Sequence, residues 1–265
     1  MRFMNLYMKN LLVLFLDLCS AICLMAQPEV VSPTRASENL KGPVRVVQYS
    51  DNVEIDSSDV FYISETTTKE FDKEGRLQYS LHSCVDLMDD IFSYEYDESG
   101  HLKVRRSHSR EIYDETYFYS VDGHLMRVTK DYKEPPFNEY NTTYKVLSHD
   151  GQGHLTDILD SSNNSRYHYV YSRRGQLQER QFFLLDKESG KDELREIISY
   201  QYNDKGDMVS NRCIYGGKEL YTTQYEYPSE YQDQYGNWLI RNVISKNGDG
   251  IHKWVERRII LYYED

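Results

Sequence analysis

The feature of this sequence that most constrains its fold is a turn motif that recurs seven times. The motif is anchored on glycines 22 to 31 residues apart: Gly75, Gly100, Gly123, Gly153, Gly175, Gly206 and Gly236. Three residues before each glycine stands a short side chain with an oxygen acceptor: Asp72, Asp97, Ser120, Asp150, Ser172, Asn203 and Asp233. Two residues after each glycine stands a large apolar side chain: Leu77, Leu102, Leu125, Leu155, Leu177, Met208 and Trp238.

This spacing predicts a β-hairpin turn. The acceptor receives backbone hydrogen bonds at the start of a type I turn, and the glycine takes the left-handed conformation that closes the turn. An aromatic residue, or a histidine, precedes the acceptor in six of the seven copies: Phe71, Tyr96, Tyr119, His149, Tyr171 and Tyr202. The flanking segments alternate polar and apolar residues, as in Tyr167 to Tyr171, which is the periodicity of a strand.

We therefore predict an all-β fold over residues 41–265, an antiparallel meander of about seven tandem hairpins. Strand twist and edge protection decide between an open twisted sheet and a partly closed barrel, and the sequence does not distinguish these two alternatives. The end strands, Leu40 to Val47 and Arg257 to Tyr263, are expected to cap the array. Lys187 to Ile198 is predicted to be a long loop or the beginning of an extended strand.

The first 26 residues have the pattern of a signal peptide. Basic Arg2 and Lys9 precede an apolar run from Leu11 to Met25, which is shorter than a membrane span of roughly 20 residues. We predict cleavage after Ala26 and a flexible lead over residues 27–40. An uncleaved anchor is the alternative, and Asp17 within the apolar run disfavours it.

Composition bounds the function of the exported chain. The whole sequence carries a formal charge of −12, and removing the signal segment, which contributes +1, leaves −13. An acidic surface argues against nucleic-acid binding, which needs clustered Lys and Arg. After cleavage the only cysteines are Cys84 and Cys213, which lie several hairpins apart and meet only if the array closes on itself, so no disulfide is expected.

The segments Tyr94 to Leu102 and Tyr200 to Met208 resemble YD repeats of the RHS type. The resemblance spans roughly residues 60 to 245, and Leu40 to Val44 and Tyr235 to Trp238 are similar to exported YD-repeat proteins of Bacteroidetes. It implies a β-meander that grows by adding hairpins, in cell-surface, carbohydrate-binding or toxin-packaging roles. The chain ends without the processing motif and toxin domain of large RHS shells, which disfavours toxin delivery.

Tyrosines at alternate strand positions are the candidate ligand-binding residues. They are expected to line up as an aromatic face that stacks on sugar rings or on a partner protein, or to form the core of a thin sheet. The set comprises Tyr94, Tyr96, Tyr117, Tyr119, Tyr167, Tyr169, Tyr171, Tyr200, Tyr202, Tyr225 and Tyr227.

Metal binding and catalysis have weaker support. His101, His124 and His154 follow the turn glycine in three repeats, where a solvent-facing polar position explains them better than a metal ladder. Each turn aspartate supplies one oxygen where calcium needs six to eight, so backbone capping explains the aspartates. No nucleophile with a base, HExxH helix, phosphate loop or CxxC pair is found, and no metal or cofactor is expected.

The sequence thus predicts an exported, non-enzymatic binding or surface-interaction module in the periplasm, at the cell surface or outside the cell. Its expected partner is a glycan or an envelope protein, and its mature form is not expected to span a membrane. A carbohydrate-active enzyme of the glycoside hydrolase type, which needs only two carboxylates brought together by folding, and a purely structural envelope protein are the alternatives.

Overall fold

The computed structural model describes residues 33–54, 61–84, 89–109, 111–135, 140–186 and 191–264. The predicted signal peptide, residues 1–26, and the first part of the predicted lead lie outside these residues. The strands of this part of the chain are β1 (Val44–Glu54), β2 (Phe61–Phe71), β3 (Leu77–Cys84), β4 (Asp90–Tyr96), β5 (Leu102–Ser107), β6 (Tyr113–Tyr119), β7 (Leu125–Tyr132), β8 (Thr142–His149), β9 (Leu155–Asp160), β10 (Ser165–Tyr171), β11 (Leu177–Leu185), β12 (Asp192–Tyr202), β13 (Met208–Tyr215), β14 (Lys218–Glu226), β15 (Ile240–Asn247) and β16 (Gly250–Tyr262). A short 3-10 helix, η2 (Ser229–Tyr231), lies between β14 and β15.

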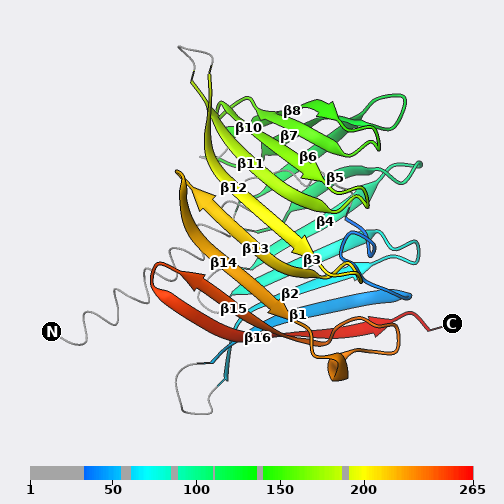
Figure 1. The fold of residues 1–265 in the computed structure, drawn as a ribbon. Coiled ribbons are helices and arrows are strands. Elements are labelled where there is room, and N and C mark those ends of the chain that lie inside the picture. The colour runs from blue at the N-terminus through cyan, green and yellow to red at the C-terminus, as the bar shows by residue number, and fades with distance from the viewer. Residues whose placement is uncertain are drawn as a thin grey trace. The chain divides into compact units, whose positions relative to one another are not determined.

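The strands form a closed barrel in which each strand pairs antiparallel with its neighbours in sequence (Figure 1). The predicted all-β meander of hairpins is confirmed, and the sheet is a closed barrel. β1 completes the ring by pairing with β16, from Val44 opposite Tyr262 to Val53 opposite Trp254. The expectation that the end strands act as separate caps is therefore wrong, because each covers the other's open edge.

All seven predicted turns adopt the expected geometry. In the turn from Asp97 to His101, the Gly100 N–H donates to the Asp97 carbonyl, and the Asp97 carboxylate accepts from the N–H groups of Ser99 and His101. The anchor glycines have φ between 76° and 88°, in the left-handed region where a side chain is strained. In six of the seven turns, all but that of Gly236, the strand register shifts at the residue before the acceptor, as between Glu95 and Tyr96, which is the bulge that the motif predicts.

The structure also bears on the predictions for residues 187–198 and for the two cysteines. Residues 192–198 belong to β12, so the extended-strand alternative holds for this part, while residues 187–190 lie outside the described chain. Closure of the array does not join the cysteines, and neither Cys84 nor the buried Cys213 is in a disulfide.

Candidate functional site

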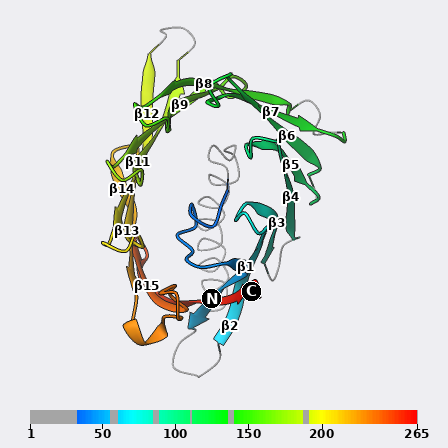
Figure 2. The ribbon, with the colours of Figure 1, turned by 90° about the vertical axis from the view of Figure 1, so that its right-hand side faces the viewer.

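The inner wall of the barrel is identified by one contact with the segment that precedes β1. Residues 33–40 form a turn that lies within the ring of strands when the barrel is seen from the end that carries the regular turns (Figure 2). The hydroxyl of Tyr49 on β1 donates to the carboxylate of Glu38 in this segment, at 3.3 Å, so Tyr49 faces inwards.

Directly opposed residues of antiparallel strands point to the same face. Following opposed pairs and alternate positions from Tyr49 around the ring therefore identifies the inner wall. One inner residue per strand, from β1 to β16, is Tyr49, Thr67, Ser80, Phe92, Arg105, Tyr117, Val128, Tyr144, Ile158, Tyr167, Arg180, Ile198, Cys213, Tyr221, Val243 and Arg258.

The candidate tyrosines lie on this inner wall. Four of them are buried: Tyr94, Tyr117, Tyr167 and Tyr169. The half-buried members are Tyr96, Tyr119, Tyr171, Tyr200, Tyr202, Tyr225 and Tyr227. Burial, more than any neighbouring charge, raises the pKa of Tyr171, Tyr202 and Tyr225 to about 12, so these phenols are neutral donors at ordinary pH.

Some of these tyrosines also replace backbone hydrogen bonds. Pairing between β5 and β6 stops at Val104 opposite Thr116, short of the regular-turn end. There the Tyr119 hydroxyl donates to the Leu102 carbonyl at 2.9 Å. The same bond joins Tyr96 to the Leu77 carbonyl at 2.7 Å and Tyr227 to the Met208 carbonyl at 2.6 Å. Tyr96 and Tyr119, each directly before a turn acceptor, and Tyr227, directly after β14, thus satisfy the carbonyl of the apolar residue that begins a preceding strand.

The three predicted histidines are neither a metal site nor free polar groups. His101 stacks on Tyr119 with ring centroids 4.7 Å apart, and His154 stacks on Tyr171 at 4.8 Å. His124 meets His149 edge to face at 5.0 Å. Each therefore packs on the residue before the acceptor of the next turn. Within the described residues, no group of three or more His, Cys, Asp or Glu side chains is placed to hold a metal ion.

Buried ion pairs on the inner wall are the feature that sequence reasoning missed. Glu115, only 1% exposed, accepts hydrogen bonds from Arg105 at 3.1 Å and from the Tyr117 hydroxyl at 2.9 Å. Arg180 and Glu196 form a second buried pair at 2.5 Å. The sequence feature that could have revealed these pairs is a charged residue at a core-facing strand position: Glu115 shares its strand face with Tyr113 and Tyr117.

A third cluster surrounds Trp238, which is 3% exposed. The Arg258 guanidinium lies 3.6 Å from the centroid of the Trp238 ring, and that of Arg241 lies 4.5 Å from it. Arg241 is paired with Glu256 and also donates to the Tyr227 hydroxyl at 3.1 Å. Cation–π contacts of this kind are worth roughly 0.5 to 2 kcal/mol each, more when water is excluded.

The segment before β1 connects distant hairpins at the regular-turn end. Its Arg35 donates to the Lys73 carbonyl in the turn after β2, at 2.8 Å. Asn39 donates to the Asp207 carboxylate in the turn after β12, at 2.7 Å. Residues 33–40 of the expected flexible lead are therefore a hydrogen-bonded part of the fold, although residues 27–32 are not described.

The outer wall has a different composition. Opposed pairs place polar residues around its middle: Gln48, Thr68, Ser93, Arg106, Thr116, Thr129, Lys145, His168, Gln181, Ser199, Arg212, Thr222 and Gln224. Apolar residues lie among them: Leu81, Leu159, Ile197 and Ile244, and the exposed Phe118, Val170 and Ile259. Cross-strand ion pairs lie on this face, such as Arg166 with Asp157 at 2.6 Å and with Asp192 at 2.5 Å. In the described part of the chain, no helix is long and apolar enough to cross a membrane.

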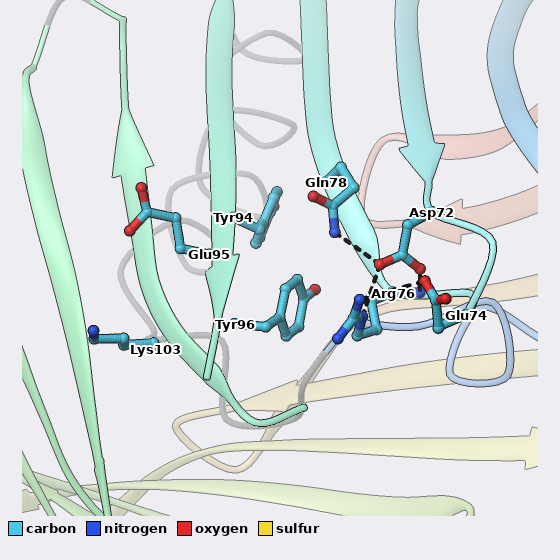
Figure 3. Close-up of a pocket in the computed structure, with 8 residues that line it drawn as sticks. All are labelled: Asp72, Glu74, Arg76, Gln78, Tyr94, Glu95, Tyr96 and Lys103. Atoms are coloured by element: carbon cyan, nitrogen blue, oxygen red, sulfur yellow. Dashed lines mark hydrogen bonds and ion pairs between the residues drawn. The ribbon is translucent and has the colours of Figure 1, made fainter. Parts of the chain in front are cut away.

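A shallow polar pocket of about 570 Å³ lies where β3 and β4 separate (Figure 3). Its lining residues are Asp72, Glu74, Arg76, Gln78, Tyr94, Glu95, Tyr96 and Lys103. The carboxylate of Asp72 already accepts from Arg76 at 2.7 Å and from Gln78 at 3.1 Å, as the dashed lines show. The pocket is therefore explained by the turn and its own bonds.

Sequence comparison does not place the chain in a family: no family model matches it, and no curated protein matches it. In particular, the resemblance to RHS-type YD repeats is not supported. A crystal structure of TcdB2-TccC3-TEV matches with a TM-score of only 0.25 and 11% identity, over 74% of this chain and 14% of that one. The physical cause of the resemblance is the turn, whose residue requirements are met in any hairpin of this geometry.

Solved structures match the fold. A porin-like protein from Bacteroides uniformis ATCC 8492 is 11% identical, with a TM-score of 0.52 over 83% of this chain and 98% of that one. A porin-like protein from Bacteroides vulgatus ATCC 8482 is 9% identical, with a TM-score of 0.36 over 84% of this chain and 100% of that one. At such identity the first match shows the fold alone. The chain therefore has a closed, sequentially wound β-barrel fold similar to that of a porin-like protein.

Proposed function

We propose that this protein is an exported binding barrel, non-enzymatic, whose outer wall faces water and whose aromatic and charged inner wall holds a glycan or protein ligand. The observation that carries the proposal is the contrast between the two walls. Aromatic residues and ion pairs such as Arg180 with Glu196 line the inside, whereas threonine, serine, glutamine and surface ion pairs dominate the middle of the outside.

The outer wall argues for water around the barrel. A barrel embedded in an outer membrane presents an apolar band about 25 Å tall to lipid, and a cation at its midplane costs roughly 2 to 4 kcal/mol. Here Arg106, Lys145 and Arg212 lie on the outer wall. We therefore propose that the protein resides in the aqueous part of the cell envelope or outside the cell, although the proteins with matching folds are named porin-like.

The inner wall argues for binding instead of hydrolysis. A glycoside hydrolase needs two carboxylates in complementary states, one protonated and one ionised. Three inner carboxylates, those of Glu115, Glu196 and Glu256, are each engaged by an arginine: Arg105, Arg180 and Arg241. A fourth, that of the buried Asp160, accepts from Thr142 at 3.0 Å and from Asn163 at 2.8 Å. Each of these carboxylates is already bonded within the wall, so a substrate would have to displace its partner to reach it.

The test is a glycan-array and envelope-protein screen with the exported protein, followed by two matched variants. Tyr200→Ala removes an inner-wall ring on β12, and Tyr79→Ala removes an outer-wall ring on β3. We expect the inner variant to weaken binding of any ligand found by about tenfold or more and the outer variant to leave binding unchanged, because stacking on one aromatic residue is worth about 1 to 3 kcal/mol.

A negative screen with both ligand classes contradicts the binding role and leaves the structural alternative. Hydrolysis of an array glycan by the folded protein contradicts the non-enzymatic role. Stable insertion into lipid vesicles, resistant to alkaline carbonate extraction, contradicts the water-facing outer wall.

A further inference from the structure

We infer that Arg258 on β16 is an oxyanion-binding residue inside the barrel, so that the ligand carries a carboxylate, sulfate or phosphate group. This inference rests on the proposed function and names the chemistry of its ligand. It depends on the hydrogen bonds that the Arg258 guanidinium does not make and on the saturation of the charges around it.

The guanidinium of Arg258 has unmet donors. Its Nε and Nη1 atoms are inaccessible to water and have no hydrogen-bond partner among the described residues. Leaving a buried polar group unpaired costs about 1 to 3 kcal/mol, and more for a charged group. Burial lowers the pKa of Arg258 below its usual value, which is the signature of a cation that its surroundings do not fully compensate.

The neighbouring acidic side chains are paired with other groups, so these donors can bind a ligand. The Glu38 carboxylate is engaged by Lys69 at 2.5 Å and by the Tyr49 hydroxyl. Glu256 is engaged by Arg241. Glu38 and Glu256 therefore each already have a cationic partner of their own.

The inner wall around Arg258 also carries Asp51, which lies directly opposite Glu256 and two positions along β1 from Tyr49. Lys69, Arg241 and Arg258 therefore share this region with three carboxylates, Glu38, Glu256 and Asp51, so the unpaired guanidinium donors, and not an excess of positive charge, are what an oxyanion would bind.

Aromatic contacts fix the guanidinium in place. Arg258 lies over Trp238 at 3.6 Å and over Tyr49 at 4.8 Å from the ring centroids. A planar guanidinium held on aromatic faces presents its N–H groups at its edge, which is the arrangement that recognises carboxylate, sulfate and phosphate oxygens.

Trp238 provides the readout. In a Trp254→Phe background it is the sole tryptophan, because the sequence has two. We would titrate the folded full chain with sodium sulfate, phosphate and glucuronate, with glucose and with sodium chloride at matched ionic strength, and follow Trp238 emission. We expect a saturable change with the oxyanions and none with glucose or chloride.

Arg258→Gln should weaken the oxyanion response at least tenfold, whereas Arg257→Gln should leave it unchanged, because the Arg257 side chain is exposed on the outer wall next to it. Arg258→Lys, which keeps the charge and loses the planar donors, should weaken it less than Gln does. A response to sulfate and phosphate indicates a free inorganic anion as ligand, and a tighter response to glucuronate indicates an anionic sugar.

No saturable response in the folded protein, or an equal response in Arg258→Gln, overturns the inference and means that the two donors stay unpaired inside the fold. These small probes do not depend on a larger ligand. If the titration is positive and the glycan and protein screen is negative, the anion site is retained and the proposed binding function is rejected. If the titration is negative and the screen is positive, the binding function is retained and the anion site is rejected.

Discussion

At the residue scale, several conspicuous side chains of the motif serve the backbone. The acceptor at the turn holds two N–H groups, and the tyrosine before it supplies a hydrogen bond that the separating strands lack. Both roles follow from the requirement that buried backbone groups be paired. Function is therefore sought in inner-wall residues outside the motif, such as Arg180 and Arg258.

Tyr119→Phe tests the hydroxyl bond to the Leu102 carbonyl. Because Leu102 is fully buried, its carbonyl loses a partner that water does not easily replace, and we expect the free energy of unfolding to fall by about 1 to 2 kcal/mol. Urea unfolding at equilibrium measures the change. Tyr140→Phe is the control, since Tyr140 is 64% exposed and should change stability very little.

Acid should weaken the turns. The hydrogen bond from the His154 side chain, with backbone N–H groups, lowers the pKa of Asp150 below its ordinary 3.8. A native-state pKa that is lowered gives stability that is present above pH 3.8 and lost as the pH falls below it. In Asp150→Asn the amide oxygen still accepts from the backbone, as Asn203 does in its own turn, but does not titrate.

The stability difference between the native protein and Asp150→Asn should therefore shrink as the pH falls through this range, when both are unfolded with urea at a series of pH values. A difference that stays constant with pH would show that the carboxylate gains nothing from being ionised.

At the element scale, consecutive hairpins are linked through their turns. The histidines that follow Gly100, Gly123 and Gly153 each lie over the glycine of the next turn, so Gly123, Gly153 and Gly175 need both a left-handed conformation and room for the neighbouring ring. A Cβ on Gly175 would lie 2.9 Å from the His154 Nε2, whereas a Cβ on Gly100 would have no atom within 4 Å.

Gly100→Ala and Gly175→Ala separate these two roles. Both place alanine at a positive φ, which costs about 1 to 2 kcal/mol. Gly175→Ala should cost more, because His154 must also move. In a His154→Ala background that excess should disappear, which a double-mutant cycle on the free energy of unfolding measures. Equal costs at the two glycines in both backgrounds would contradict the linkage.

At the scale of the whole molecule, closure depends on contacts between the two ends of the chain. β1 pairs with β16, and Asn237 near β15 is hydrogen bonded to the segment before β1. Its side chain accepts from the Lys41 N–H at 2.8 Å and donates to the Lys41 carbonyl at 2.9 Å. Forming such long-range contacts costs a large loop-closure entropy, so the loss of one of them lowers the stability of the whole barrel.

Asn237→Ala should therefore lower the free energy of unfolding by about 2 kcal/mol or more, because Lys41 loses partners for both backbone groups. It should also make the chain easier to cut by trypsin after Arg35 and Lys41. Asn242→Ala, on the outer wall of β15, is the control for a surface amide. Unchanged proteolysis in Asn237→Ala would show that the segment is held by its other contacts.

The sequence by itself determined the turns and hence the strands, because each turn is specified within six consecutive residues: an acceptor, a left-handed glycine and the apolar residue that begins the next strand. The alternation of residues such as Tyr113, Glu115 and Tyr117 also determined which side chains share a face. These are local requirements of backbone geometry, and a single chain displays them directly.

Only the tertiary structure decided that the sheet closes, which face is the inside, and which charges meet. Closure joins Val44 to Tyr262, and pairs such as Arg180 with Glu196 depend on the register between strands. Twist and register are set by the sum of many small interactions around the ring, so no short stretch of sequence contains them. The unmet donors of Arg258 emerge only when Trp238, Tyr49 and Arg241 are brought around it by that closure.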